Sequence, residues 1–364
     1  MTVMNRRMRG GRAVVAAVAW VVLAWSGATA AAQQSDRVVG SGGSLLGKVV
    51  GTSPNEVQVE DRNGDVKKIS IDKVREVQFA GEPASLRAAR GLLARGRGGD
   101  ALAEVAKVEK NELEGVEPMV LAEMQYVKAA GAARVALETG AKVDEANALV
   151  AGFLAKNPQS HHTYEMQELL GDLLGQAGKS GPAGEAYAQL AKGPPAFRIR
   201  AATANARLAF DQGKYDDAIR AYDNALQIAA DDEASLAQKQ AASLGKARSL
   251  AQAGKHADAL ELVQKIIKDA DPEAKEMLAR AYATLGAVYR SIGDKDQDAV
   301  ISYLMVDLVY NTVPECHAEA LYNLAELWEK GKNPERARQA RDSLSASYPA
   351  SPWKRKLDAP AKAS

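Results

Sequence analysis

The sequence predicts a mainly α-helical protein in which a small antiparallel β module precedes a right-handed α-α superhelix of about seven helical hairpins. Three observations support this fold class. The 364 residues include 70 alanines but only 19 aromatic residues, a composition that favours closely packed helices over a β-sandwich. Apolar and polar residues alternate between residues 37 and 80. Beyond residue 83, glycines that are typical of turns recur at intervals of about 40 residues.

The first 32 residues have the three parts of a secretory signal peptide. A basic start and the apolar run 13–25 are followed by small residues up to Ala32; the basic start contains Arg6, Arg7, Arg9 and Arg12. The apolar run is shorter than the roughly 20 residues that span a bilayer, so we expect residues 1–32 to be cleaved. An uncleaved N-terminal anchor is the alternative. Cleavage predicts a periplasmic or secreted protein, and loss of the four arginines changes its formal net charge from +1 to −3.

Residues 33–82 are predicted to form the small β domain. Four runs alternate apolar with polar residues, which indicates four or five short, half-buried strands; the runs are 48–51, 56–60, 66–71 and 74–79. Asn63-Gly64 predicts a two-residue hairpin turn, because both turn positions need positive φ. The pattern resembles a small SH3-like or Sm-like barrel in shape, and such modules act as adaptors or packing caps more often than as catalytic units.

Residues 83–350 are predicted to form helical hairpins, followed by a frayed C-terminal tail at 351–364. The segments that begin at Gly96, Gly213 and Gly254 each place an alanine five residues after a turn glycine. Looser copies begin at Gly140, Gly178, Gly293 and Gly331. The successive spacings of 35 to 44 residues suit a two-helix unit that needs neighbours to bury its apolar face.

The segment around Gly213 resembles the tetratricopeptide repeat. It has residues 206–210 before the turn glycine and a helix after it that carries Tyr215, Ala218, Tyr222 and Ala225; similar patterns surround Gly178 and Gly293. The Pro158 and Pro349 linkers resemble those of long-repeat bacterial envelope proteins, such as the periplasmic partner of the Tol-Pal system and the outer-membrane assembly repeat lipoprotein. The spacing exceeds the standard 34 residues, which leaves individual repeat boundaries open.

The sequence contains no linear motif for catalysis, a cofactor or a metal, so we expect none of the three. His161 and His162 follow the Pro158 turn, where adjacent side chains are expected to diverge to the surface rather than to bind a metal. Cys316 and His317 are neighbours in sequence, which rarely face each other as a nucleophile and a base. Cys316 is the only cysteine and lies far from the cleavage region, which excludes an internal disulfide and a bacterial lipid anchor.

One group of arginines is a candidate partner-binding site. In tetratricopeptide arrays the first helix of each hairpin lines a concave groove, and Arg207 and Arg248 both lie six residues before their turn glycine. The resemblance implies that they stack in register. The full candidate set, which would suit a peptide carboxylate or an acidic segment, is Arg200, Arg207, Arg248, Arg280 and Arg290. The alternative is a solvated face in which these arginines pair with neighbouring acids.

The leading functional hypothesis is an exported, non-catalytic scaffold that binds a protein or peptide through the helical repeats. The near balance of 47 basic and 46 acidic residues argues against a nucleic-acid partner, and we expect no stable membrane insertion. Two alternatives stay open: a structural component of envelope assembly or cell division, and an enzyme whose site has no linear motif. Clustered ionisable groups in a concave pocket would favour the enzyme. The oligomeric state stays open as well.

Overall fold

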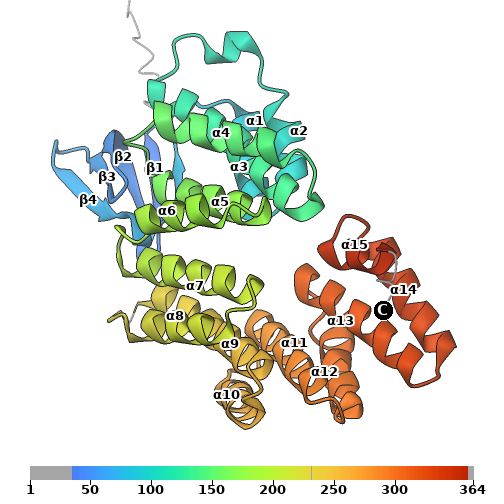
Figure 1. The fold of residues 1–364 in the computed structure, drawn as a ribbon. Helices are drawn as coiled ribbons and strands as arrows, with labels where there is room; N and C mark the ends of the chain where they lie inside the picture. The colour runs from blue at the N-terminus through green and yellow to red at the C-terminus, as the bar shows by residue number, and fades with distance from the viewer. Residues whose placement is uncertain (1–34, 231, 360–364) are drawn as a thin grey trace, which may run out of the picture. The chain divides into compact units, whose positions relative to one another are not determined.

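The structure is a computed structural model and describes residues 35–230 and 232–359 (Figure 1). The expected signal peptide, residues 1–32, lies outside the described residues. Within the described ranges, no helix is both long enough and apolar enough to cross a membrane.

The β module is a five-stranded antiparallel sheet with strand order β4-β3-β2-β1-β5. The strands are β1 (Asp36–Gly40), β2 (Gly43–Thr52), β3 (Glu56–Glu60), β4 (Val66–Ser70) and β5 (Val74–Gln78), and a short 3₁₀ helix (Ile71–Lys73) joins β4 to β5. Strand β2 pairs with β1 through its first half and with β3 through its second half. Gly47 sits at the change of partner, where a Cβ would come within 2.2 Å of the Glu60 carbonyl oxygen.

The expected closed barrel is wrong. Among the described residues β4 and β5 are the two edges of the sheet and do not pair with each other. The apolar face of the sheet, which includes Val49, Val57 and Val59, is covered by helices instead of closing on itself. Edge strand β4 begins with the exposed residues Val66, Lys67 and Lys68, a pattern that discourages pairing with another strand.

The β3–β4 hairpin predicted from Asn63-Gly64 is confirmed, but its turn type differs from the expectation. Only Gly64 adopts positive φ, at 87°. The Asp61 carboxylate accepts hydrogen bonds from the backbone N–H groups of Asn63 and Asp65 and pairs with Lys67 at 3.1 Å. This side chain therefore stabilises its own turn.

The seven predicted helical hairpins are confirmed. They are α1 (Ala84–Ala94) with α2 (Gly98–Val105), α3 (Pro118–Thr139) with α4 (Val143–Lys156), α5 (Thr163–Gln176) with α6 (Ser180–Leu190), α7 (Pro195–Asp211) with α8 (Tyr215–Gln227), α9 (Glu233–Gln252) with α10 (His256–Asp269), α11 (Lys275–Ile292) with α12 (Asp296–Leu308), and α13 (Pro314–Lys330) with α14 (Pro334–Ser347). A 3₁₀ helix (Lys110–Leu113) lies between α2 and α3. Successive hairpins pack against each other along the chain (Figure 1).

The turn glycines end the first helix of each hairpin through a left-handed backbone conformation. Six of the seven predicted turn glycines have positive φ. Gly331 is the exception with φ of −76°, and the next residue, Lys332, takes the positive φ of 57° instead. A lysine tolerates this conformation at some cost, so the hairpin turn forms without a glycine at the left-handed position.

The sheet and the first helices share one hydrophobic core. Phe79 after the last strand, Leu86 and Leu93 of α1 and Val105 of α2 are all buried in the same cluster, which confirms the expected continuous interface. Polar contacts reinforce it: the Tyr164 hydroxyl of α5 donates to the Asn55 side chain of the β2–β3 turn at 2.9 Å. The β module is therefore joined to the first three hairpins through a common core.

The expected frayed tail is wrong for the segment that directly follows Trp353. Residues Pro352–Asp358 form an additional helix, α15, whose Ser351 side chain accepts a hydrogen bond from the backbone N–H of Lys354. Trp353 and Leu357 pack against a buried cluster that includes Tyr322 of α13 and Leu344 of α14. The tail thus covers apolar surface on the last hairpin.

Candidate functional site

The first helices α7, α9, α11 and α13 pack side by side and, with α8 and α15, line a cavity of about 440 Å³, here called the central cavity. Its aromatic lining comes from Phe210, Tyr222 and Trp353. Its charged lining consists of Arg207, Arg248, Arg280, Asp211, Glu315 and Glu319. Three cations and three acids leave no excess of positive charge, so the lining as a whole is not basic.

The structure brings together only part of the predicted arginine set. Arg207, Arg248 and Arg280 line the central cavity, and Arg290 lines an adjacent cavity together with Arg248 and Trp353. Arg200 faces a different cavity beside the sheet. Each of the five has a polar partner: Arg200 pairs with Glu168, Arg207 with Asp172, Arg248 with Glu319, Arg280 with Glu276 and Glu315, and Arg290 donates to the Asn323 side chain. The pairing with neighbouring acids, which the sequence left as the alternative, is thus present.

Arg248 is held in place by two neighbouring first helices. Its Nη2 lies 2.9 Å from Glu319 Oε1 of α13, and its Nε donates to the Thr284 hydroxyl of α11 at 3.2 Å. Burial alone would lower the pKa of Arg248, but the Glu319 carboxylate outweighs it and the net shift is upward. Arg248 therefore serves to fix α9 against α11 and α13.

Arg207 and Arg280 are more accessible. Their side chains are 53% and 41% exposed, and their pairs with Asp172 (3.2 Å) and Glu276 (3.1 Å) involve partly exposed groups. Exposed ion pairs contribute little free energy, so these guanidinium groups can exchange partners at small cost. Nearby, the Thr203 hydroxyl is buried and has no hydrogen-bond partner among the described residues. The central cavity thus offers two exchangeable cations and one unsatisfied hydroxyl.

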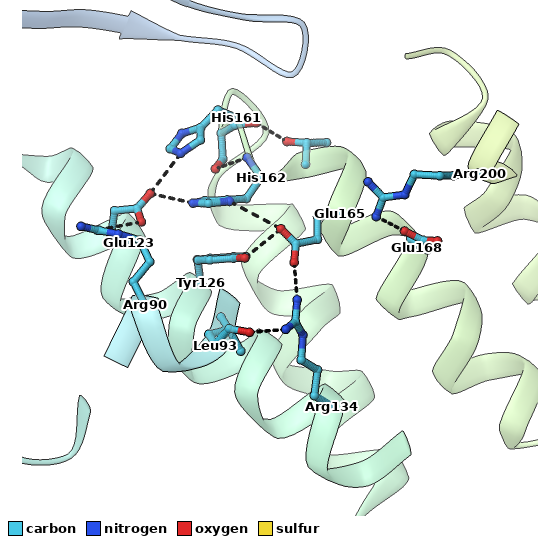
Figure 2. A network of polar contacts seen from close by, with 12 residues as sticks. Arg90, Leu93, Glu123, Tyr126, Arg134, His161, His162, Glu165, Glu168 and Arg200 are labelled. Atoms are coloured by element: carbon cyan, nitrogen blue, oxygen red, sulfur yellow. Dashed lines mark hydrogen bonds and ion pairs between the residues drawn. The ribbon is translucent and has the colours of Figure 1, made fainter. Parts of the chain in front are cut away.

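A second cavity of about 440 Å³, here called the junction cavity, lies where β5 meets α1, α3, α5 and α7. A network of buried charges borders it (Figure 2). Arg90 of α1 lies 2.7 Å from Glu82, 3.4 Å from Glu123 of α3 and 3.5 Å from Glu76 of β5. The charge of this nearly buried guanidinium is therefore balanced by three carboxylates.

His161 and His162 do not diverge to the surface; that expectation is wrong. Both rings point at the same oxygen of Glu123, with Nε2 to Oε1 distances of 3.4 Å for His161 and 2.8 Å for His162 (Figure 2). Their ring centroids lie 3.9 Å apart. The segment 157–162 is a turn rather than a regular helix start, and the Ser160 hydroxyl oxygen accepts the backbone N–H of His162. This turn geometry lets adjacent side chains share one direction.

The protonation of this trio follows from its burial. Burial lowers the pKa of His161 to about 3, so the ring is neutral near pH 7. Burial would raise the pKa of Glu123, but its imidazole neighbours and Arg90 lower it to about 2, so the carboxylate is ionised. Sequence reasoning missed Glu123 because it lies 38 residues before His161, in the middle of a helix. The His-His pair after Pro158 was the only sequence signal of this site.

Glu165 of α5 anchors the other side of the network. Arg134 Nη2 of α3 lies 2.9 Å from Glu165 Oε1, and the Tyr126 hydroxyl donates to Glu165 Oε2 at 2.8 Å (Figure 2). The Tyr126 ring also stacks on His162, with centroids 3.4 Å apart and planes within 2°. Burial and the adjacent Glu165 carboxylate raise the pKa of Tyr126, so its hydroxyl stays a hydrogen-bond donor.

Cys316 and His317 form separate contacts. His317 Nε2 lies 2.8 Å from Asp307 and its Nδ1 lies 2.8 Å from the Tyr348 hydroxyl. Cys316 is buried, and desolvation raises the pKa of its thiol to about 12. A thiol that stays protonated is a poor nucleophile, so this pair is not arranged for nucleophilic catalysis.

Comparison with protein families identifies the repeat. Residues 203–274 and 244–303 match the family model of the tetratricopeptide repeat. The central helices are tetratricopeptide repeats. No curated protein sequence matches the chain.

Solved structures show the same fold at low sequence identity. A tetratricopeptide repeat protein from Parabacteroides merdae has a TM-score of 0.50 at 15% identity, covering 72% of this chain and 91% of its own. A Rap protein in complex with Competence and Sporulation Factor has a TM-score of 0.50 at 14% identity, covering 75% of this chain and 77% of its own. The resemblance to long-repeat envelope proteins stays a prediction.

Proposed function

We propose that this chain is an exported, non-catalytic scaffold that binds an acidic segment of a protein or peptide partner in the central cavity. The observation that carries the proposal is the pair of accessible guanidinium groups, Arg207 and Arg280, which line one cavity formed by adjacent tetratricopeptide first helices. Stacked helical repeats present extended concave surfaces that bind other chains. The Rap structure, solved with Competence and Sporulation Factor, supports a binding role for an array of this fold.

The chemistry of the lining defines the ligand. A carboxylate of the partner replaces Asp172 at Arg207 or Glu276 at Arg280, so recognition is an exchange of ion-pair partners rather than attraction by a basic surface. Apolar atoms of the ligand lie against Phe210 and Trp353. Because charges are exchanged, binding weakens as salt concentration rises.

A direct binding measurement tests this proposal. Fluorescence anisotropy compares labelled acidic peptides with the same peptides in which Asp and Glu are replaced by Asn and Gln. The variant R207E/R280E should weaken binding of the acidic peptides by at least about tenfold, which corresponds to one lost charge-assisted contact. R220E is the matched control, because Arg220 is 70% exposed on second helix α8 and does not line the central cavity.

Crosslinking and pull-down from the envelope fraction extends the test to the natural partner. A partner that is captured by the wild type and by R220E but not by R207E/R280E supports the central cavity. A partner captured equally by all three proteins contradicts the cavity as the binding site, and acidic peptides that bind no better than their amide versions contradict the acidic ligand.

Export is part of the same proposal and rests on the sequence of residues 1–32. Cell fractionation should place the protein in the periplasm or the medium, and N-terminal sequencing should find a start near Ala31 or Gln33. Recovery of the intact N-terminus in the cytoplasm would contradict export without affecting the binding measurement.

A further inference from the structure

Three potential metal ligands converge in the buried network beside the junction cavity. Glu123 Oε1, His161 Nε2 and His162 Nε2 all lie within 4.8 Å of one another. The two Nε2 to Oε1 distances are 2.8 and 3.4 Å. Ligand atoms around one tetrahedral zinc ion, with bonds of about 2.0–2.2 Å, lie roughly 3.3 Å apart. The trio is therefore within a few tenths of an ångström of the spacing that an ion needs.

We infer that Glu123, His161 and His162 form a binding site for a divalent transition-metal ion of the zinc class. Two imidazole nitrogens and one carboxylate oxygen suit zinc, cobalt or iron, whereas calcium and magnesium prefer all-oxygen ligands. This inference is independent of the proposed scaffold function, which uses a different cavity.

The groups around the trio hold it in an orientation that favours a metal. His162 Nδ1 lies 3.9 Å from Glu165 Oε2, and Glu165 is fixed in turn by Arg134 and Tyr126. A histidine ligand generally directs its second nitrogen at a carboxylate, which sets the tautomer and leaves the other nitrogen unprotonated. Stacking on Tyr126 restricts the His162 ring further.

The protonation states match those of a metal site. Metal ligands must be deprotonated, and Glu123 is ionised and His161 neutral near pH 7. Arg90 lies 3.4 Å from Glu123 on the other carboxylate oxygen, Oε2, and is itself balanced by Glu82 and Glu76. Its charge therefore opposes the ion less than an unpaired guanidinium would.

The junction cavity supplies a route for the ion. His161 and His162 both line this cavity, whereas Glu123 lies behind them. The side chains of the three ligands are 7%, 14% and 2% exposed, in that order. An ion bound by three protein ligands keeps an open position for water, and here that position faces the cavity.

Titration of the purified full chain with ZnCl₂ and CoCl₂ at neutral pH tests the inference. Calorimetry should show one bound Zn²⁺ per chain, and Co²⁺ should give visible absorption bands typical of a four-coordinate nitrogen and oxygen site. H161Q and H162Q should each weaken Zn²⁺ binding by at least tenfold. H256Q is the matched control, because His256 lies on α10, away from the trio, and should leave binding unchanged.

Circular dichroism of each variant establishes that it is folded. If H161Q or H162Q fails to fold, X-ray absorption at the zinc edge of the wild-type protein decides instead, because two imidazole ligands give a recognisable scattering pattern. Absence of stoichiometric binding to the folded wild type overturns the inference. Retained binding in both folded histidine variants, or a zinc spectrum without two imidazoles, overturns it as well.

Discussion

Tyr187 of α6 lies directly over the bare Cα of Gly171 on α5: a Cβ on that glycine would come within 2.3 Å of the tyrosine ring. The same relationship recurs between Gly245 and Tyr222, at 2.3 Å, and between Gly286 and Tyr303, at 2.7 Å. These glycines lie inside helices and have ordinary helical conformations. Their role is to make room for an aromatic ring where two helices cross, which is how small residues permit close helix packing.

Gly171→Ala should therefore destabilise the protein by about 1–3 kcal/mol, because the Tyr187 ring has to move. The ring is also held by a hydrogen bond from its hydroxyl to Asp172 at 2.7 Å. Gly152→Ala in α4 is the control: a Cβ there meets nothing within 4 Å among the described residues, and alanine should stabilise the helix by about 0.5–1 kcal/mol. Urea denaturation measures both. Equal stability of the two variants would contradict the packing role.

Breaking the Arg248–Glu319 pair should cost more than breaking an exposed pair. Arg248→Met leaves Glu319 buried, at 8% exposure, without its main partner, and we expect a loss of about 3–5 kcal/mol. Arg220→Met, which breaks an exposed pair with Asp217, should change stability by less than about 1 kcal/mol. A double-mutant cycle with Glu319→Leu should show that the two changes are not additive. Additive losses would mean that the pair contributes no specific coupling.

Cys316 should resist alkylation in the folded protein. Desolvation raises the pKa of its thiol to about 12, so the reactive thiolate is scarce at pH 8. Iodoacetamide labelling, followed by mass spectrometry, should be slow in buffer and fast in urea. A rate in buffer equal to that in urea would contradict the burial.

The same thiol predicts the direction of a pH dependence. Because its pKa is higher in the folded state, its contribution to stability is complete below about pH 9 and is lost as pH rises towards about 12. Thermal unfolding of wild type and Cys316→Ala between pH 8 and pH 11 should show a steeper alkaline loss for the wild type. Parallel curves would rule out Cys316 as a contributor.

The sequence predicted the elements that repeat and missed the contacts that do not. Period-two alternation located the strands, and turn glycines such as Gly213 located the hairpins, because each signal is local. Barrel closure failed as a prediction because it depends on what covers the valine face of the sheet, and that face is covered by helices. The pattern of an isolated strand cannot report this.

The candidate sites show the same limit. Register along the repeats correctly brought Arg207 and Arg248 to one cavity, but their acidic partners Asp172 and Glu319 lie 35 and 71 residues away along the chain. Glu123 is equally distant from the two histidines that it faces. Long-range pairing of charges, rather than any linear motif, defines both sites.

The shared core of sheet and helices makes a final prediction about folding cooperativity. Leu86 is fully buried on α1 in the cluster that contains Phe79 and Val57. Leu86→Ala should destabilise the protein by about 2–5 kcal/mol, because a cavity remains where the side chain was. Leu149→Ala on α4, where the residue is 44% exposed, is the control and should cost less than about 1 kcal/mol.

Hydrogen exchange distinguishes a shared core from two independent ones. In Leu86→Ala the backbone amides of β3, including that of Val57, should lose protection together with those of α1 and α3, because one cluster buries side chains from all three elements. If only the helical amides lose protection, the sheet is stable on its own and the two parts unfold separately. Loss in both parts means that the β module depends on the first hairpins for its fold, since its apolar face has no other cover among the described residues.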